Sequence, residues 1–417
     1  MAHVDKLVVT NLSALKAKYG SGTRRITDAI KYLIQADKKR GLLTRLLALD
    51  DVATMKALQA PAVTSAKSEQ QNKAAIDAAY RALTPDYLVL LGSLDVIPHQ
   101  RLKNPMFHKE GDEDANVPSD LPYACEAPYS TQPRDFRGPT RVVGRVPDLT
   151  GGTDPSYLVG LLKTAATYVR RAPEQYADYF GVSAAIWKAS TALSLKNTFG
   201  ASADLQVVPP KSFEWPAPLL KRRAHFINCH GSDHDPFFYG QPASGDDVYP
   251  EAHSAKYLKG KVAQGTVVAA ECCYGAQLYP PSARHGQAGI CNTYLQGSAY
   301  GFFGSSTIAY GPSSGNGEAD YICQFFLQQV LAGGSLGRST LEARQKFIQW
   351  VTILDPQNLK TLAQFNLMGD PSIHAVAPAA HGLSHTKTYK SVFPTKEALP
   401  PGRELRRQCA KAGLALR

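Results

Sequence analysis

The chain has 417 residues, of which 44% are hydrophobic and 19% are charged, and this balance excludes a disordered or fibrous protein. It contains no apolar run of about 18 residues, so we expect no membrane span, and its seven cysteines are irregularly spaced, unlike a secreted disulfide framework. The formal net charge of +11 is spread along the chain, which favours a solvated basic surface over a nucleic-acid site.

The first third of the chain alternates between strand and helix patterns, which predicts a doubly wound α/β sheet. Its last strand pattern is a continuous apolar run, as in a buried parallel strand covered on both faces by helices. The expected elements, in chain order, are a strand at 6–10, a helix at 25–35, a strand at 42–48, a helix at 71–82 and a strand at 87–91.

The next segment is less regular. Residues 103–140 are rich in Pro, Asp and Gly and predict a surface excursion or a small β insert. Residues 141–147 predict an edge strand closed by Pro147. Residues 158–170 predict a helix that joins the two halves of the molecule.

A second α/β series begins near residue 180. Its expected strands lie at 183–189, 225–228, 266–270 and 299–303, and its expected helices at 320–331 and 341–351. The stretch from 387 to the end holds eight Lys/Arg against two Glu. We therefore divide the chain into an N-terminal α/β subdomain (1–160), a catalytic subdomain (161–380) and a basic tail (381–417).

Two apolar strand patterns of the second series end at reactive side chains. The sequence HFINCHG ends with His230 and Gly231, and the later sequence TVVAAECCYG carries Cys272 and Cys273. The carboxyl ends of neighbouring parallel strands form the ligand crevice of open α/β sheets, so a His and a Cys should meet there. A thiolate is a strong nucleophile, an imidazole can protonate a leaving amine, and the Gly231 N–H can stabilise an oxyanion. The pattern indicates a cysteine peptidase.

Strand–His-Gly followed by strand–Cys resembles the signature of the caspase-like fold, which caspases, legumains, separases and gingipains share. Further segments resemble the gingipain branch, and together they run from about residue 5 to 375. These segments are Asp86–Pro98, Ser119–Tyr123, Val143–Pro147, Gly301–Tyr310 and Phe365–Ser372. The resemblance implies a caspase-like α/β fold of mainly parallel sheets flanked by helices in two subdomains. It also implies an endopeptidase that works through a thioester acyl-enzyme and needs no cofactor.

The same resemblance implies roles for single residues. His230 would be the general acid, and the gingipain-like spacing Cys-x-x-Gly selects Cys272 as nucleophile, whereas the caspase spacing would select Cys273. Gly231 would supply the oxyanion N–H. Cys273 would then be buried or line the substrate pocket. The loop from Ser305 to Tyr310 would form a wall of the cleft.

The sequence departs from the gingipain pattern where an acid should support the histidine. The matching stretch, residues 184–191, contains no acid, so Asp233 and Asp235 become candidates for that role or for substrate binding. Specificity for basic residues is therefore not carried over. No metal-ligand spacing is present among the scattered histidines.

We expect a protein or peptide substrate, no membrane or nucleic-acid partner, and a cytoplasmic location, because no signal-peptide pattern is present. A cytoplasmic peptidase requires control, which predicts a narrow substrate, an activating partner or self-cleavage. The alternatives are a catalytically inactive interaction protein that keeps the fold, favoured by the missing acid, and a nucleic-acid-binding protein, favoured by charge alone.

Overall fold

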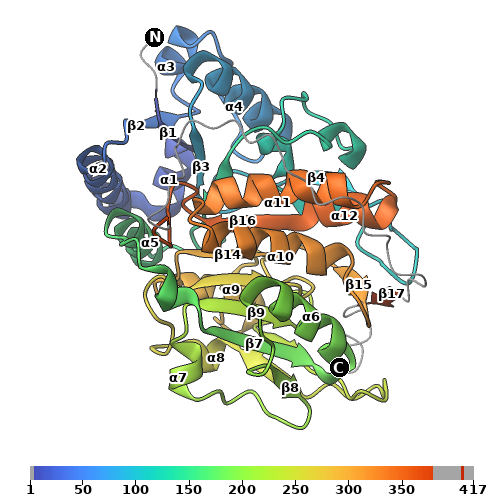
Figure 1. Cartoon of the computed structure of the whole chain (residues 1–417). Coiled ribbons are helices and arrows are strands. Elements are labelled where there is room, and N and C mark those ends of the chain that lie inside the picture. Colours follow the sequence, from blue (N-terminus) through green and yellow to red (C-terminus); the bar gives the residue numbers. More distant parts are fainter. Residues whose placement is uncertain (1–3, 379–404, 408–417) are drawn as a thin grey trace.

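The computed structural model describes residues 4–378 and the backbone of residues 405–407. Its centre is a ten-stranded sheet with the strand order β2-β1-β3-β6-β16-β14-β13-β9-β7-β8, shown in Figure 1. One continuous hydrophobic core extends from the first strand to the last of this sheet. The α/β fold class expected from the sequence is confirmed.

The sheet consists of two parallel blocks that run in opposite directions. The blocks meet where β14 and β16 pair in antiparallel fashion. The first block contains β2 (Thr44–Ala48), β1 (Lys6–Thr10), β3 (Tyr87–Leu91), β6 (Val143–Val146) and β16 (Phe365–Gly369). The second contains β14 (Gly301–Ser305), β13 (Val267–Ala270), β9 (Ala224–Asn228), β7 (Tyr179–Ala184) and β8 (Gln206–Val208). All strands of the second block therefore end at the same edge of the sheet.

Helices cover both faces of the sheet. On one face α10 contacts α6, α11 and α12, and on the other α5 contacts both α2 and α9 (Figure 1). The helices are α1 (Leu12–Tyr19), α2 (Thr23–Lys39), α3 (Val52–Ala57), α4 (Glu69–Leu83), α5 (Ser156–Ala166), α6 (Lys188–Phe199), α7 (Ala217–Leu220), α8 (Ala255–Leu258), α9 (Ile290–Gln296), α10 (Glu318–Leu331), α11 (Leu336–Trp350) and α12 (Pro356–Gln364).

Several short strands lie outside the main sheet. The expected β insert is a hairpin, since β4 and β5 pair with each other, and β10, β11 and β12 form a three-stranded sheet beside the end of β9. Their bounds are β4 (Gln100–Lys103), β5 (Asn116–Ser119), β10 (His230–Gly231), β11 (Phe237–Tyr239), β12 (Glu251–Ser254), β15 (Tyr310–Pro312) and β17 (Leu405–Arg407).

Two sequence-based predictions of strands were wrong. The strand before Pro147 is not an edge strand, because β6 lies between β3 and β16; Pro147 follows its last paired residue, so its missing N–H costs no ladder bond. The strand expected at 183–189 lies earlier, as β7. Ala185–Trp187 form a 3-10 turn that leads into α6, so the apolar run there belongs mostly to the turn and helix.

The expected division near residue 160 stays a prediction. The strand β16 comes late in the chain, yet it pairs in parallel with β6 and belongs by direction to the first block. The basic tail lies mostly outside the described residues. Within the part of the chain that the structure describes, no helix is both long and apolar enough to cross a membrane.

A buried ion-pair network joins β1 to α2 and to the residue after β16. The ammonium group of Lys6 lies 2.6 Å from Asp37 Oδ2 and 2.8 Å from Asp370 Oδ2, and all three side chains are buried. Asp370 accepts hydrogen bonds from the Lys6 ammonium group and from the Oγ and backbone N–H of Ser372. The neighbouring lysine lowers the pKa of Asp370, and the two carboxylates raise the pKa of Lys6 against the opposing effect of burial.

Removing one partner of this network should destabilise the fold strongly. The substitution Asp370→Ala should lower the free energy of unfolding by about 3–5 kcal/mol, because it leaves the Lys6 charge buried and less well compensated. Asp28→Ala, which removes an exposed pair with Lys31, is the matched control and should cost less than about 1 kcal/mol. Urea unfolding of the two variants measures the difference, and equal midpoints would contradict a stabilising network.

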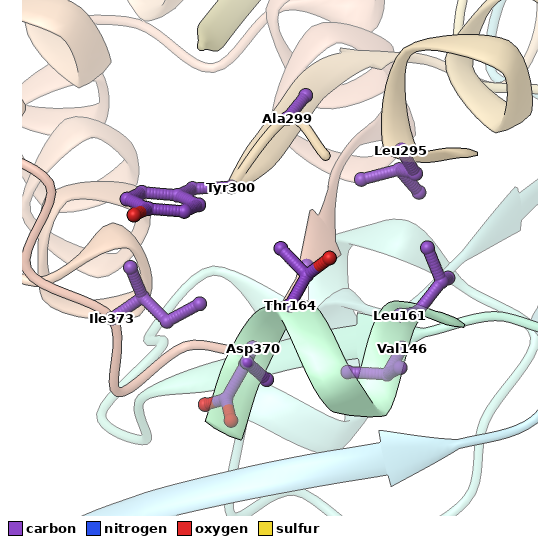
Figure 2. A pocket seen from close by; sticks show the side chains of 10 residues that line it. Val146, Leu161, Thr164, Leu295, Ala299, Tyr300, Asp370 and Ile373 are labelled. Atoms are coloured by element: carbon purple, nitrogen blue, oxygen red, sulfur yellow. The ribbon is translucent and has the colours of Figure 1, made fainter. Parts of the chain in front are cut away.

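A small hollow lies between α5 and the central strands, as Figure 2 shows. Its lining is mostly apolar, with Leu161 and Thr164 from α5 and Tyr300 from just before β14. Because β14 begins at that side, the hollow is at the opposite sheet edge from the carboxyl ends of β9 and β13. We therefore do not assign it to the candidate active site.

Candidate active site

The strands β9 and β13 bring the histidine and the two cysteines to one edge of the sheet. They pair in parallel, with Ala270 opposite Ile227, and the Glu271 N–H donates to the Ile227 carbonyl at 2.8 Å. The pairing ends there, and Cys272 and Cys273 follow in the turn after β13. The contacts of each cysteine, and not the register of the two strands, therefore distinguish them.

The side chain of Cys272 lies in an enclosed apolar environment. It is fully buried, and its Sγ is 3.8 Å from the carbonyl oxygen of Ile227. Burial, reinforced by the neighbouring Cys229 thiol, raises the pKa of Cys272 well above its usual value. A thiol in such an environment is difficult to ionise, which disfavours Cys272 as a nucleophile.

Cys273 lies directly against the His-Gly turn. A side-chain carbon at position 231 would overlap the carbonyl oxygen of Cys273, so only glycine permits this close approach. The Cys273 Sγ accepts the N–H of Ala309 at 3.1 Å. Tyr274, the next residue, has a positive φ of 54°, and this turn carries the chain away from the sheet edge immediately after Cys273.

The orientation of His230 follows from its contact with Gln241. His230 Nε2 lies 2.9 Å from Gln241 Oε1, while the Gln241 amide nitrogen donates to the carbonyls of Gly245 and Asp246 at 3.1 and 3.2 Å. These two bonds identify the amide nitrogen of Gln241, so its oxygen faces the ring. His230 Nε2 must then carry the proton, and in the neutral ring Nδ1 is the basic nitrogen.

Aromatic side chains hold the histidine ring in place. The ring centroids of Trp187 and Tyr249 lie 4.3 and 5.0 Å from that of His230, and Tyr249 meets it edge-on. Trp187 belongs to the 3-10 turn after β7, where the sequence had predicted a strand. The histidine is therefore fixed by packing on one side and by an amide on the other.

Gln241 is the residue beside His230 that sequence reasoning missed. The sequence had indicated Asp233 or Asp235 in place of the absent acid, but a neutral amide supports His230. Gln241 follows a loop glycine, and its own N–H donates to the carbonyl of Val208. No local pattern could have indicated it, because its position depends on contact with β8.

The two loop aspartates have other contacts. Asp233 is exposed, and its carboxylate accepts from Gln277 Nε2 at 2.6 Å and lies 2.8 Å from His234 Nδ1. Asp235 accepts the Tyr239 hydroxyl at 2.8 Å, and burial raises its pKa. Neither contact joins the aspartates to His230.

The loop after β14 lies beside Cys273, and its role as a wall of a substrate cleft stays a prediction. Its polar side chains are directed into the protein, however. Ser305 Oγ donates to the Thr307 carbonyl at 2.7 Å, and the Tyr310 hydroxyl donates to Asp112 Oδ2 at 2.8 Å. Both side chains are buried, which leaves the backbone of the loop as the element most suited to contact a peptide.

A partly buried carboxylate that the sequence did not single out contacts the same region. Asp114, between β4 and β5, accepts the hydroxyl of Tyr274 at 3.0 Å and the N–H of Ile308 at 3.3 Å. Burial raises its pKa. Asp114 thereby joins the β insert to the residues that flank Cys273 and Ala309.

Among the described residues, no group of three or more His, Cys, Asp or Glu is arranged to hold a metal.

The open sheet with helices on both faces, with His-Gly and Cys at adjacent strand ends, defines the caspase-like class of α/β folds. Solved structures confirm this fold. The complex of the pro- and mature domains of RgpB from Porphyromonas gingivalis matches with a TM-score of 0.59 and 12% identity, over 88% of this chain and 79% of that one.

Two further solved structures give the same result. The Arg-specific cysteine proteinase gingipain R matches with a TM-score of 0.58 and 11% identity, over 89% of this chain and 78% of that one. A structure described as a protease matches with a TM-score of 0.55 and 15% identity, over 89% and 78% of the two chains. No protein-family model and no curated protein sequence matches the chain. The likeness therefore establishes the fold and not the specificity.

Proposed function

We propose that this protein is a cysteine endopeptidase in which Cys273 is the nucleophile and His230 the general acid and base. The close packing of Gly231, the residue after His230, against the Cys273 backbone is the observation that carries the proposal. The spacing Cys-x-x-Gly favoured Cys272. Both thiols are buried, but burial raises the pKa of Cys272 well above its usual value, which supports its neighbour. The fold shared with cysteine proteinases supports the reaction class.

The proposed reaction uses only side chains and backbone of this chain. His230 Nδ1 takes the proton of the Cys273 thiol, and the thiolate attacks the carbonyl carbon of the scissile peptide. The Gly231 N–H donates to the oxyanion that forms. The C–N bond then breaks as His230 returns the proton to the leaving amine, and water hydrolyses the thioester to release the acid and restore the thiol.

Gln241 acts in this proposal as a positioning residue. Its Oε1 accepts a hydrogen bond from the Nε2–H of His230 and so presents Nδ1 to the thiol throughout the cycle. A carboxylate at this position would stabilise the imidazolium and raise the pKa of the histidine, whereas a neutral amide orients the ring with a weaker effect on its charge. The missing third acid is therefore compatible with catalysis.

The proposal is tested by chemical labelling and by hydrolysis. The protein should cleave members of a positional-scanning peptide library, and a peptidyl thiol-reactive probe followed by peptide mapping should modify Cys273 in preference to Cys272. Labelling of Cys272 alone would overturn the choice of nucleophile. Intact folding with no hydrolysis and no selective labelling would favour the alternative, an inactive interaction protein.

The cytoplasmic location and an activating partner stay predictions.

A further inference from the structure

The strand β15 (Tyr310–Pro312) starts beside the candidate nucleophile. Ala309, the residue before it, donates its N–H to Cys273 Sγ at 3.1 Å. Outside the ten-stranded sheet, β15 pairs in antiparallel fashion with β17 (Leu405–Arg407), near the end of the chain. A segment distant in sequence therefore occupies a strand edge that begins at the thiol.

The direction of this pairing is that of a substrate. Tyr310 is opposite Arg407 and Pro312 is opposite Leu405, so β17 runs toward Ala309 and Cys273 as its residue numbers rise. A peptide bound by strand addition uses its backbone for affinity. In a peptide substrate, the residues on the amino side of the scissile carbonyl must run toward the nucleophile as their numbers rise. The strand β17 has this direction.

Both reactive side chains are shielded from solvent in this state. His230 is 3% exposed and Cys273 is 0% exposed. A peptidase that acts on other proteins must present these groups to its substrate. The structure therefore has the features of a closed state in which an internal strand already occupies the edge that leads to the thiol.

We propose that β15 is the substrate-binding strand of the peptidase, and that Leu405–Arg407 is a pseudo-substrate that occupies it and inhibits the enzyme. This inference rests on the proposed function. The occupant of β15 is a segment of the same chain. The external substrate is an extended peptide that displaces this segment. Inhibition within one chain is independent of protein concentration, because the tethered segment has a fixed effective concentration.

The pairing indicates which backbone groups matter most. Antiparallel partners alternate between pairs that exchange two hydrogen bonds and pairs that exchange none. Pro312 has no N–H to donate, so a bonded pair of Pro312 and Leu405 would lack one of its two hydrogen bonds. Gly311 and Arg406 can form both hydrogen bonds and are therefore the expected bonded pair. The Arg406 N–H should then point at β15, and the Leu405 N–H should point away from it.

Two proline variants of the full-length chain test the inference. Arg406→Pro removes the N–H that faces β15 and should raise kcat/KM for a peptide substrate about tenfold or more, through a lower KM at unchanged kcat. Leu405→Pro is the matched control in the same segment and should leave both constants unchanged. An unchanged kcat/KM in the Arg406→Pro chain would overturn the inference.

Hydrogen exchange separates a failure of this inference from a failure of the proposed function. The Gly311 amide should be protected in the wild type and should lose that protection in the Arg406→Pro chain only. If protection changes as expected but no chain cleaves any peptide, the peptidase proposal and the inhibition both fail. If the wild type cleaves peptides while its Gly311 amide is unprotected, the pseudo-substrate is refuted and the peptidase stands.

Discussion

Replacing Cys273 with alanine should lower kcat/KM for a peptide substrate by about 10⁴-fold or more, as does the loss of a nucleophile in other hydrolases. Its Sγ lies next to the Ala309 N–H, and its backbone contacts Gly231, so no other thiol can replace it in this position. Cys272→Ala should retain kcat within about threefold, since it removes a buried thiol that forms no part of the proposed reaction. Peptide hydrolysis under pseudo-first-order conditions measures both.

Two further variants separate chemistry from positioning. His230→Ala should cost about as much as Cys273→Ala, because the two groups act as a unit. Gln241→Ala should cost less, about 10–100-fold, and Gln241→Glu should restore much of the loss while shifting the pH dependence of kcat/KM, since a carboxylate stabilises the imidazolium. An active Cys273→Ala chain together with an inactive Cys272→Ala chain would show that the nucleophile is Cys272.

The second large effect is a loss of stability in mild acid. His225 and His253 are both buried, and a ring nitrogen of each lies 2.8 Å from the hydroxyl of Tyr294. Burial lowers the pKa of His225 to about 4 and that of His253 to about 3. Both rings are therefore neutral in the folded protein over the range in which they become charged in the unfolded chain.

The sign of the effect follows from proton binding. Below pH 6.5, the usual histidine value, the unfolded chain binds two protons that the folded chain does not bind, so stability falls as the pH falls. Each histidine contributes about 1.4 kcal/mol per pH unit until the pH approaches its folded pKa. Between pH 6.5 and pH 5 the two residues together should lower the free energy of unfolding by roughly 3 kcal/mol.

Urea unfolding between pH 7.5 and pH 5 measures this slope. His253→Gln should remove about 1.4 kcal/mol per pH unit from it, whatever its effect on stability at neutral pH. The control is His285→Asn, at an exposed position with a φ of 51° that asparagine tolerates, and it should leave the slope unchanged. A wild-type stability that is flat between pH 6.5 and pH 5 would refute the role of this buried pair.

The sequence by itself determined the features that depend on local pattern. A run of five apolar residues predicts the buried strand Tyr87–Leu91, and the structure has β3 at those same residues. The apolar runs before His230 and Cys272 likewise predict β9 and β13, because strand formation and the exit of the chain at glycine are encoded by neighbouring residues. The α/β class and the resemblance to the caspase-like fold followed from these local signals and were confirmed.

Only the tertiary structure decided which residues the fold brings together. The proposed choice between Cys272 and Cys273 depends on the contact between Gly231 and the turn after β13, two segments that are distant in sequence. The support of His230 by Gln241 and the position of β6 inside the sheet depend in the same way on partners elsewhere in the chain. Local periodicity shows that a strand forms and which of its residues share a face, but pairing across long loops is decided by the packing of the whole core.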